Sequence, residues 1–173
     1  MVYFNEIIGQ TELVEALRNS VKNGKTAHAY IFTGPEGIGK RMMAEAFAGA
    51  LLCSSNKEGE ACGECSCCNM VKSGSNPDLH TIEAEGNNIG IEHIRNIQSE
   101  IIVKPLYSGK KIYLIIDADK MTTQAQNCLL KTLEEPPPYA VLILTTSNYN
   151  AIIETVKSRT LKYNFKKNSR DEI

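Results

Sequence analysis

Residues 34–41 read GPEGIGKR and fit the phosphate-binding pattern G-x-x-x-x-G-K-[ST] at every position except the last. In such a loop, backbone N–H groups surround phosphate oxygens and the lysine adds a positive charge. Gly34, Gly37, Gly39 and Lys40 are therefore predicted to form an anion cradle, or P-loop, between a strand and a helix. A glycine-rich turn that matches by chance is the alternative. The apolar run before the loop, the helix-forming residues after it and the aspartate-ended strand downstream favour the cradle.

Two positions argue against ATP hydrolysis. In P-loop enzymes Mg²⁺ is held by the loop hydroxyl and by an aspartate that ends a later strand. Asp117 supplies the aspartate, but Arg41 replaces the hydroxyl, and a guanidinium has no lone pair for a metal. Ala118 replaces the carboxylate that orients the attacking water. We expect ATPase activity to be slow or absent and Mg²⁺ not to bind. The sequence does not decide whether ATP or ADP binds. The alternative is an active ATPase that uses Asp119 or Glu36.

Four cysteines have the spacing of zinc ligands. Cys53, Cys62, Cys65 and Cys68 follow C-x8-C-x2-C-x2-C, and four thiolates complete a tetrahedral Zn²⁺ site with no open position. Residues 53–70 are therefore predicted to be a structural zinc-binding insert. A polar loop of reduced cysteines is the alternative, and Cys67 could replace a neighbouring ligand.

Other residues with functional chemistry are more ambiguous. Ser158 and Arg159 precede a possible strand, where the arginine is either solvated surface or an arginine finger that reaches a neighbour's terminal phosphate. The pattern alone does not decide between the two. His28, His80 and His93 lack metal spacing with one another, and Cys128 is expected in the core.

The elements that must position these residues alternate between helix and strand. Strands are predicted at 27–34, 78–86, 111–117 and 140–148, with a further one after Arg159, and helices at 11–24, 41–53, 89–103 and 122–135. Because the strands are continuous apolar runs, they indicate a parallel sheet covered on both faces. The predicted fold is a three-layer α/β P-loop NTPase.

Composition limits the possible partners. The 173 residues, 42% of them hydrophobic, suit a single domain. The formal net charge of −1 gives no general attraction to nucleic acid or to an anionic membrane. The amino terminus lacks the basic start and apolar stretch of a secretory signal, and no long uncharged run follows. We expect a cytoplasmic protein, in whose reducing compartment the cysteines are not disulfides.

The motifs resemble those of a known family in their order along the chain. FNEIIGQ, HAYIFTGPEGIGK, the four-cysteine insert, LIIDADKM, NCLLKTLEEPP and SRT cover nearly the whole chain and are similar to the bacterial clamp-loader ATPases of DNA polymerase III, a branch of AAA+. Arg41 and Ala118 make the chain more similar to the non-catalytic delta-prime type of subunit than to the catalytic gamma/tau type, which remains the alternative.

The resemblance implies a role for each region. The AAA+ core would span residues 1–165, and residues 166–173 would begin a helical lid, so that the chain is a piece of a longer protein and monomeric in isolation. Arg159 would be an arginine finger offered to a gamma/tau subunit. Ser147 and Asn148 would lie at the sensor for the terminal phosphate, and Ile7, Ile8 and Gly9 would flank adenine.

The resemblance also implies partners. These are the gamma/tau and delta subunits and, through the complex, the sliding clamp and primer-template DNA. A polymerase activity would belong to the DNA polymerase III holoenzyme, because the chain shows no paired carboxylates for two-metal nucleotidyl transfer. A third reading, from a different class, is a zinc-dependent nucleic-acid-binding module on an inert P-loop scaffold. The glutamates of the insert disfavour that reading.

Overall fold

A five-stranded parallel sheet forms the centre of the molecule. The computed structural model describes residues 1–167, and all strand pairs in this part of the chain are parallel, in the order β2-β3-β4-β1-β5. The strands are β1 (Ala29–Thr33), β2 (Leu79–Ile82), β3 (Lys111–Ile115), β4 (Ala140–Thr146) and β5 (Leu161–Asn164). The structure therefore confirms the predicted parallel sheet.

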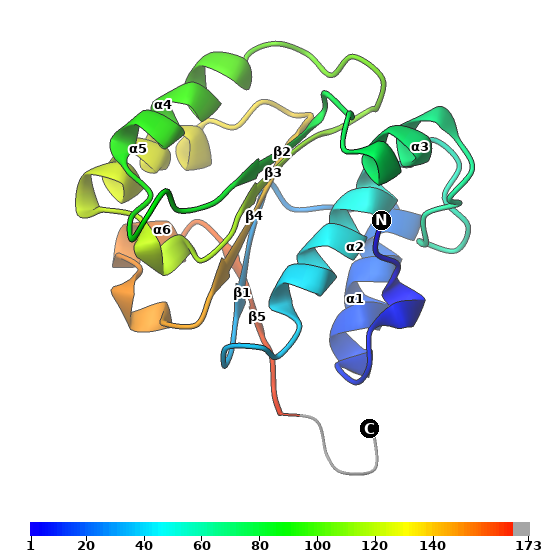
Figure 1. Cartoon of the computed structure of the whole chain (residues 1–173), viewed down its shortest axis with the longest axis horizontal. Helices are drawn as coiled ribbons and strands as arrows, with labels where there is room; N and C mark the ends of the chain where they lie inside the picture. Colours follow the sequence, from blue (N-terminus) through cyan, green and yellow to red (C-terminus); the bar gives the residue numbers. More distant parts are fainter. Residues whose placement is uncertain (168–173) are drawn as a thin grey trace.

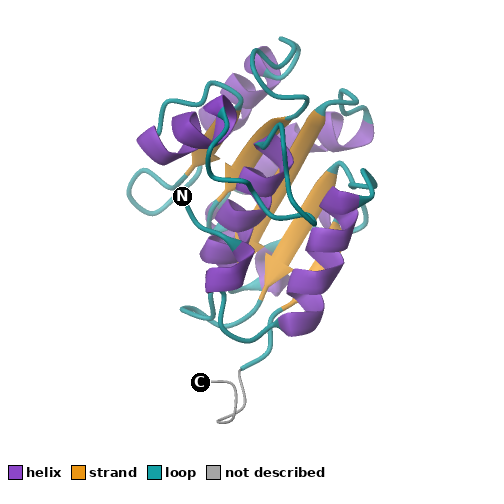
Figure 2. Cartoon of the chain, turned by 90° about the vertical axis from the view of Figure 1, so that its right-hand side faces the viewer, coloured by secondary structure: helices purple, strands orange, loops and turns teal. Residues whose placement is uncertain are grey.

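Helices cover both faces of this sheet and complete three layers (Figure 1). One face carries α1 (Thr11–Lys22), α2 (Lys40–Leu52) and the short α3 (Ser66–Ser73). The other carries α4 (Ile91–Glu100), α5 (Thr123–Glu134) and α6 (Glu154–Lys157). Short 3-10 helices form at Phe4–Glu6, Ala118–Lys120 and Tyr149–Ala151. Figure 2 shows the first face, with helices in front of the strands.

The sheet divides the hydrophobic core in two. Every residue of β1, β3 and β4 is buried, as expected for central strands of a sheet that is covered on both faces. On the α1 and α2 side, Tyr30 and Phe32 pack against Phe47 and other apolar residues. On the α4 and α5 side, Ile94 and Ile97 of α4 and Leu129 of α5 are buried against the sheet. The packing on both faces fixes the strand ends and the loops that follow them.

Most predicted elements are present with shorter bounds. The strand predicted at 78–86 ends at Ile82, and the helix predicted at 89–103 ends at Glu100, before Pro105. Thr122 caps α5, because its hydroxyl accepts a hydrogen bond from the backbone N–H of Ala125 at 3.1 Å. Helices α3 and α6 were not predicted. The prediction of a lid that begins at residues 166–173 falls mostly outside the described residues.

Candidate functional site

The P-loop lies where β1 ends and α2 begins, at the edge of the sheet that holds the carboxyl ends of the strands. Gly37 and Gly39 have φ angles of 74° and 98°, a left-handed conformation that residues with a side chain adopt only with strain. Gly34 is needed for space, because a Cβ there would lie 2.8 Å from the Cβ of Phe165. The three predicted glycines therefore meet specific backbone requirements of the loop.

Lys40 is buried and turned onto its own loop. Its ammonium donates to the carbonyl oxygens of Gly34 at 2.8 Å and Pro35 at 2.7 Å, and to Ser147 Oγ at 3.0 Å. Burial lowers the pKa of Lys40, while the negative charges of Asp117 and Asp119 and the more weakly acting Glu36 oppose that shift. For the ammonium to reach a phosphate, it must exchange these carbonyl contacts for contacts with the ligand.

Arg41 is held between two carboxylates. Its Nε donates to Glu45 at 2.9 Å, one turn along α2, and its Nη2 donates to Glu83 at 2.6 Å, just after β2. These hydrogen bonds raise the pKa of Arg41 above its ordinary value. A fixed cation therefore stands at the position where the P-loop pattern places a hydroxyl.

A pocket of about 360 Å³ opens between the P-loop and the ends of β3 and β4. It is lined by the P-loop, by Arg41 and Met42, and by Asp117, Thr145 and Ser147. The chain at Asp117 is left-handed, with φ 53°, and its backbone N–H donates to Thr145 Oγ1 at 3.0 Å. Strain of this kind in a residue other than glycine is concentrated at functional sites.

The two positions that follow Asp117 differ in their surroundings. Ala118 is completely buried and brings no polar group to the pocket. Asp119 accepts a hydrogen bond from Thr146 Oγ1 at 2.7 Å, so its carboxylate is engaged at the end of β4. The carboxylate of Asp119, the alternative group for orienting the attacking water, therefore already accepts a hydrogen bond within the protein.

At the predicted sensor, it is Ser147 that lines the pocket and contacts Lys40. Asn148, the other residue predicted there, is exposed, and its backbone N–H donates to Thr146 Oγ1 at 3.0 Å. Sequence analysis missed Thr145 and Glu83. Both could have been suspected because they end or follow parallel strands at the edge where the P-loop lies.

Arg159 lies far from its own P-loop along the sheet. Strand β5 is parallel to β1, with Leu161 opposite Tyr30, so Arg159 stands at the amino-terminal edge of the strands. Its guanidinium forms an ion pair with Glu134 at 2.9 Å and donates to the carbonyl of Thr155 at 2.9 Å. The side chain remains 34% exposed. Any phosphate it contacts must therefore come from another molecule.

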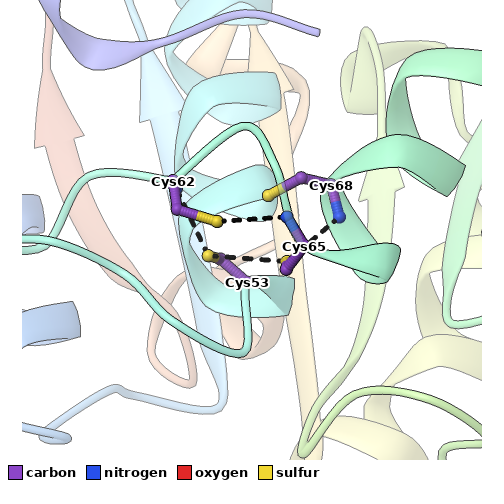
Figure 3. Close-up of side chains that lie close together, drawn as sticks. All are labelled: Cys53, Cys62, Cys65 and Cys68. Atoms are coloured by element: carbon purple, nitrogen blue, oxygen red, sulfur yellow. Dashed lines mark hydrogen bonds between the residues drawn. The ribbon is translucent and has the colours of Figure 1, made fainter.

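The four predicted zinc ligands are brought together. The sulfur atoms of Cys53, Cys62, Cys65 and Cys68 all lie within 4.8 Å of one another, and Figure 3 shows the four side chains converging. A tetrahedral zinc site with bonds of about 2.3 Å has sulfur atoms about 3.8 Å apart. Cys53 and Cys65 lie at 3.9 Å, so this donor set fits Zn²⁺.

Backbone N–H groups stabilise the cluster further. The backbone N–H of Cys62 donates to the sulfur of Cys53 at 3.3 Å, and the backbone N–H of Cys65 donates to the sulfur of Cys62 at 3.4 Å. The N–H of Cys68 donates to Cys65, which is the N-cap of α3, at 3.4 Å. Burial opposes ionisation of Cys65, but hydrogen bonds from Ser54 and Cys68 outweigh it and lower its pKa to about 5. Burial instead raises the pKa of Cys68.

Cys67 points away from the cluster. It is buried, its Sγ donates to the carbonyl of Tyr107 at 3.4 Å, and the hydroxyl of Ser108 donates to it at 3.4 Å. Cys67 therefore does not join the four clustered sulfur atoms. Cys128 is partly buried and donates to Gln98 Oε1 at 3.4 Å.

The amino terminus is attached to this insert. Glu60 accepts hydrogen bonds from the backbone N–H groups of Phe4 at 3.1 Å and Asn5 at 3.2 Å, and Met1 and Tyr3 pack against the cysteine cluster. The insert and the first six residues thus form one structural unit.

Comparison with known proteins identifies the family. A family model described as "DNA polymerase III, delta subunit" matches residues 9–169. The chain belongs to the DNA polymerase III clamp-loader family. Among curated clamp-loader proteins, it is 37% identical to the tau subunit of Bacillus subtilis, over 95% of this chain and 29% of the relative. It is 36% identical to the delta' subunit of the same organism, over 87% of this chain and 45% of the relative.

The delta' subunit of Pseudomonas aeruginosa is 37% identical, over 79% of this chain and 42% of the relative. The clamp-loader chain thus spans between about a quarter and a half of the length of these relatives. The two kinds of subunit match it at nearly the same identity, so identity alone does not assign the chain to either.

Solved structures confirm the P-loop NTPase-like fold. A gamma subunit-related protein of Thermotoga maritima superposes with a TM-score of 0.69 at 24% identity, over 94% of this chain and 47% of that one. The RuvB Holliday junction branch migration motor of the same organism gives 0.62 at 13%, over 99% and 50%. None of the helices described for the clamp-loader chain is both long and apolar enough to span a membrane.

Proposed function

We propose that this chain is the core of a non-catalytic, delta-prime-type subunit of the clamp loader, acting in the cytoplasm to help load the sliding clamp onto primer-template DNA. The observation that carries the proposal is the fixed position of Arg41, whose guanidinium is bound by Glu45 and Glu83 beside the P-loop pocket. A guanidinium there has no lone pair to offer Mg²⁺, and Ala118 offers no carboxylate to the attacking water.

A nucleotide titration with and without Mg²⁺ tests this proposal. We expect any ATP or ADP affinity of the natural chain to be independent of Mg²⁺ and no ADP to form from ATP. Arg41→Thr together with Ala118→Glu should make nucleotide affinity depend on Mg²⁺, whereas Arg41→Lys, which keeps the charge, should not. Magnesium-dependent hydrolysis by the natural chain would instead assign it to the catalytic gamma/tau type, which the equal identity to tau keeps as the second candidate.

The second part of the proposal is that Arg159 serves a neighbouring gamma/tau subunit as an arginine finger. The amino-terminal position of Arg159 on the sheet and its partial exposure support a contact with another molecule. In a loader assembled with the delta and gamma/tau subunits, Arg159→Ala should lower DNA-stimulated ATP turnover at least tenfold, since such fingers contribute about 10³ to 10⁵ in rate.

Glu134→Gln is the matched control, because it removes the ion pair but keeps the guanidinium. It should leave turnover within about twofold. Both variants should melt close to the natural chain, since a partly exposed ion pair contributes about 1 kcal/mol or less. Unchanged turnover in the Arg159 variant would reject the finger.

The remaining parts concern zinc and assembly. The cysteine cluster would hold one structural Zn²⁺ with four thiolates, which stabilises the insert and does no chemistry. The isolated chain would be a monomer. A gel-filtration peak at the size of an oligomer would contradict the monomer.

A further inference from the structure

A second pocket lies on the other side of the sheet, between the edge strand β2, strand β3 and helix α4. Its volume is about 430 Å³, within the range of small-molecule sites. The residues with functional chemistry that line it are His80, Glu83, Glu85, His93, Glu100 and Tyr113. No motif of the sequence points to this pocket, and it is separate from the pocket at the P-loop.

Two polar groups of this pocket have no hydrogen-bond partner. The hydroxyl of Tyr113, a residue with 0% exposure, and Nε2 of His80 are both buried and unpaired. The two rings stack with their centroids 4.8 Å apart and an interplanar angle of 13°. Buried polar groups are nearly always paired, and each unpaired one costs free energy. A ligand with complementary polar groups would satisfy both.

The charges of the residues that line the pocket indicate the charge of that ligand. Glu83, Glu85 and Glu100 all line the pocket, and no lysine or arginine does among the described residues. Nδ1 of His80 lies 3.3 Å from Glu100 Oε2, so a proton on Nδ1 leaves Nε2 free to accept an N–H. The pocket therefore offers acceptors to a cation.

A metal ion fits the pocket less well than an organic cation. Nδ1 of His93 accepts the backbone N–H of Gly90 at 3.2 Å, which leaves Nε2 to carry the proton, 3.6 Å from Glu85. This imidazole has no free lone pair for a metal. Within the described residues, only the four-cysteine cluster brings three or more ligand atoms of the metal-binding kind close together.

We propose that this pocket binds a small organic cation through its ammonium or guanidinium group. The carboxylates pair with the charge, Nε2 of His80 accepts one N–H, and the hydroxyl of Tyr113 bonds to a polar atom of the ligand. Glu83 shows that this lining accepts a guanidinium, because it already binds that of Arg41 at 2.6 Å. Glu83 thus lines this pocket and also pairs with Arg41 beside the P-loop, although cation binding in this pocket does not depend on the function proposed for that loop.

Calorimetric titration with agmatine, which carries one ammonium and one guanidinium, tests the proposal. Agmatine should bind the natural chain at least tenfold more tightly than uncharged butane-1,4-diol. Glu100→Gln should weaken agmatine binding about tenfold, because hydrogen bonds between charged groups are the stronger class. Tyr113→Phe should weaken it several-fold while the melting temperature without ligand stays equal or rises, because the lost hydroxyl has no partner in the protein.

Glu92→Gln is the matched control. Glu92 lies on the same helix and pairs with Arg95 outside the pocket, so its loss should leave agmatine affinity unchanged. Equal weakening by the Glu92 and Glu100 variants, or agmatine binding no tighter than butanediol binding, would overturn the proposal. A capped Gly-Arg-Gly peptide that binds as tightly as agmatine would assign the site to a protein side chain, and a peptide that does not bind would assign it to a free metabolite.

Discussion

The P-loop and the cysteine cluster are both short, glycine-containing segments with the chemistry to bind a ligand, but they differ in how far their atoms are already arranged for one. In the cluster, four sulfur atoms lie within 4.8 Å of one another and backbone N–H groups already donate to them. In the P-loop, Lys40 donates to its own loop carbonyls and Arg41 is bound by two glutamates. A phosphate ligand would have to displace existing contacts, whereas zinc would displace only protons.

The largest expected effect comes from breaking the cluster. Cys68→Ser removes one of four zinc ligands from the buried side of the insert, and we expect loss of bound zinc and a fall in the free energy of unfolding of about 5 kcal/mol, since metal-binding energy becomes folding energy in such sites. Metal analysis of the purified protein and chemical denaturation measure both. Cys67→Ser, one position away and outside the cluster, should keep one zinc per chain. Equal zinc loss in both variants would contradict the assignment of ligands.

A second prediction concerns Asp78, which holds the loop next to Cys67. Asp78 is 1% exposed and accepts the backbone N–H groups of Leu106, Tyr107 and Ser108 at 2.7 to 2.8 Å, which fixes the loop that contacts Cys67. Burial opposes ionisation, but these three donors, helped by Lys111, lower the pKa of Asp78. Asp78→Ala should cost about 3 kcal/mol of stability, because it removes three hydrogen bonds to a buried, charged acceptor.

The sign of the pH dependence follows from the lowered pKa. The unfolded pKa is about 3.9, so Asp78 contributes its full stabilisation above that pH and loses it as the pH falls through the lower folded value. Asp78→Asn should therefore flatten the acid side of a plot of unfolding free energy against pH. A plot that keeps the slope of the natural chain would show that Asp78 does not carry this dependence.

The smallest effect is expected in the P-loop. Gly34→Ala places a Cβ 2.8 Å from the Cβ and 2.9 Å from the carbonyl oxygen of Phe165, so the loop or the end of β5 must shift, at a cost of about 1 to 2 kcal/mol. Gly109→Ala, with no atom within 4 Å of the added group, should be neutral within about 0.5 kcal/mol. Thermal denaturation compares the two, and equal melting temperatures would show that the P-loop adjusts freely.

Patterns that are local in sequence predicted most of the fold and part of the site. The apolar runs around Ile31 and Ile143 predicted buried parallel strands, and the cysteine spacing predicted which four sulfur atoms converge. The strand predictions depend on burial of a whole element, and the cysteine prediction depends on residues close to one another along the chain. Helix α3 was missed because its cysteines and polar residues obscure the helical period.

Contacts between distant segments could not be predicted in this way. The pairing of Arg41 with Glu83 joins residues 42 positions apart, and Ser147 reaches Lys40 across 107 positions. The pocket beside Tyr113 arises from a gap left between packed elements, which no single-sequence pattern records. Such features follow from the packing of side chains after the sheet has formed.

The attachment of residues 1–6 to the insert has a practical consequence for making the protein. Because Met1 and Tyr3 pack against the cysteines, and Glu60 holds Phe4 and Asn5, a polyhistidine tag fused ahead of Met1 would begin beside four thiols. Imidazoles and thiolates are both good ligands for zinc, so the tag would compete for the ion and exchange it with a nickel purification resin. A cleavable tag without histidine keeps the native ligands in place.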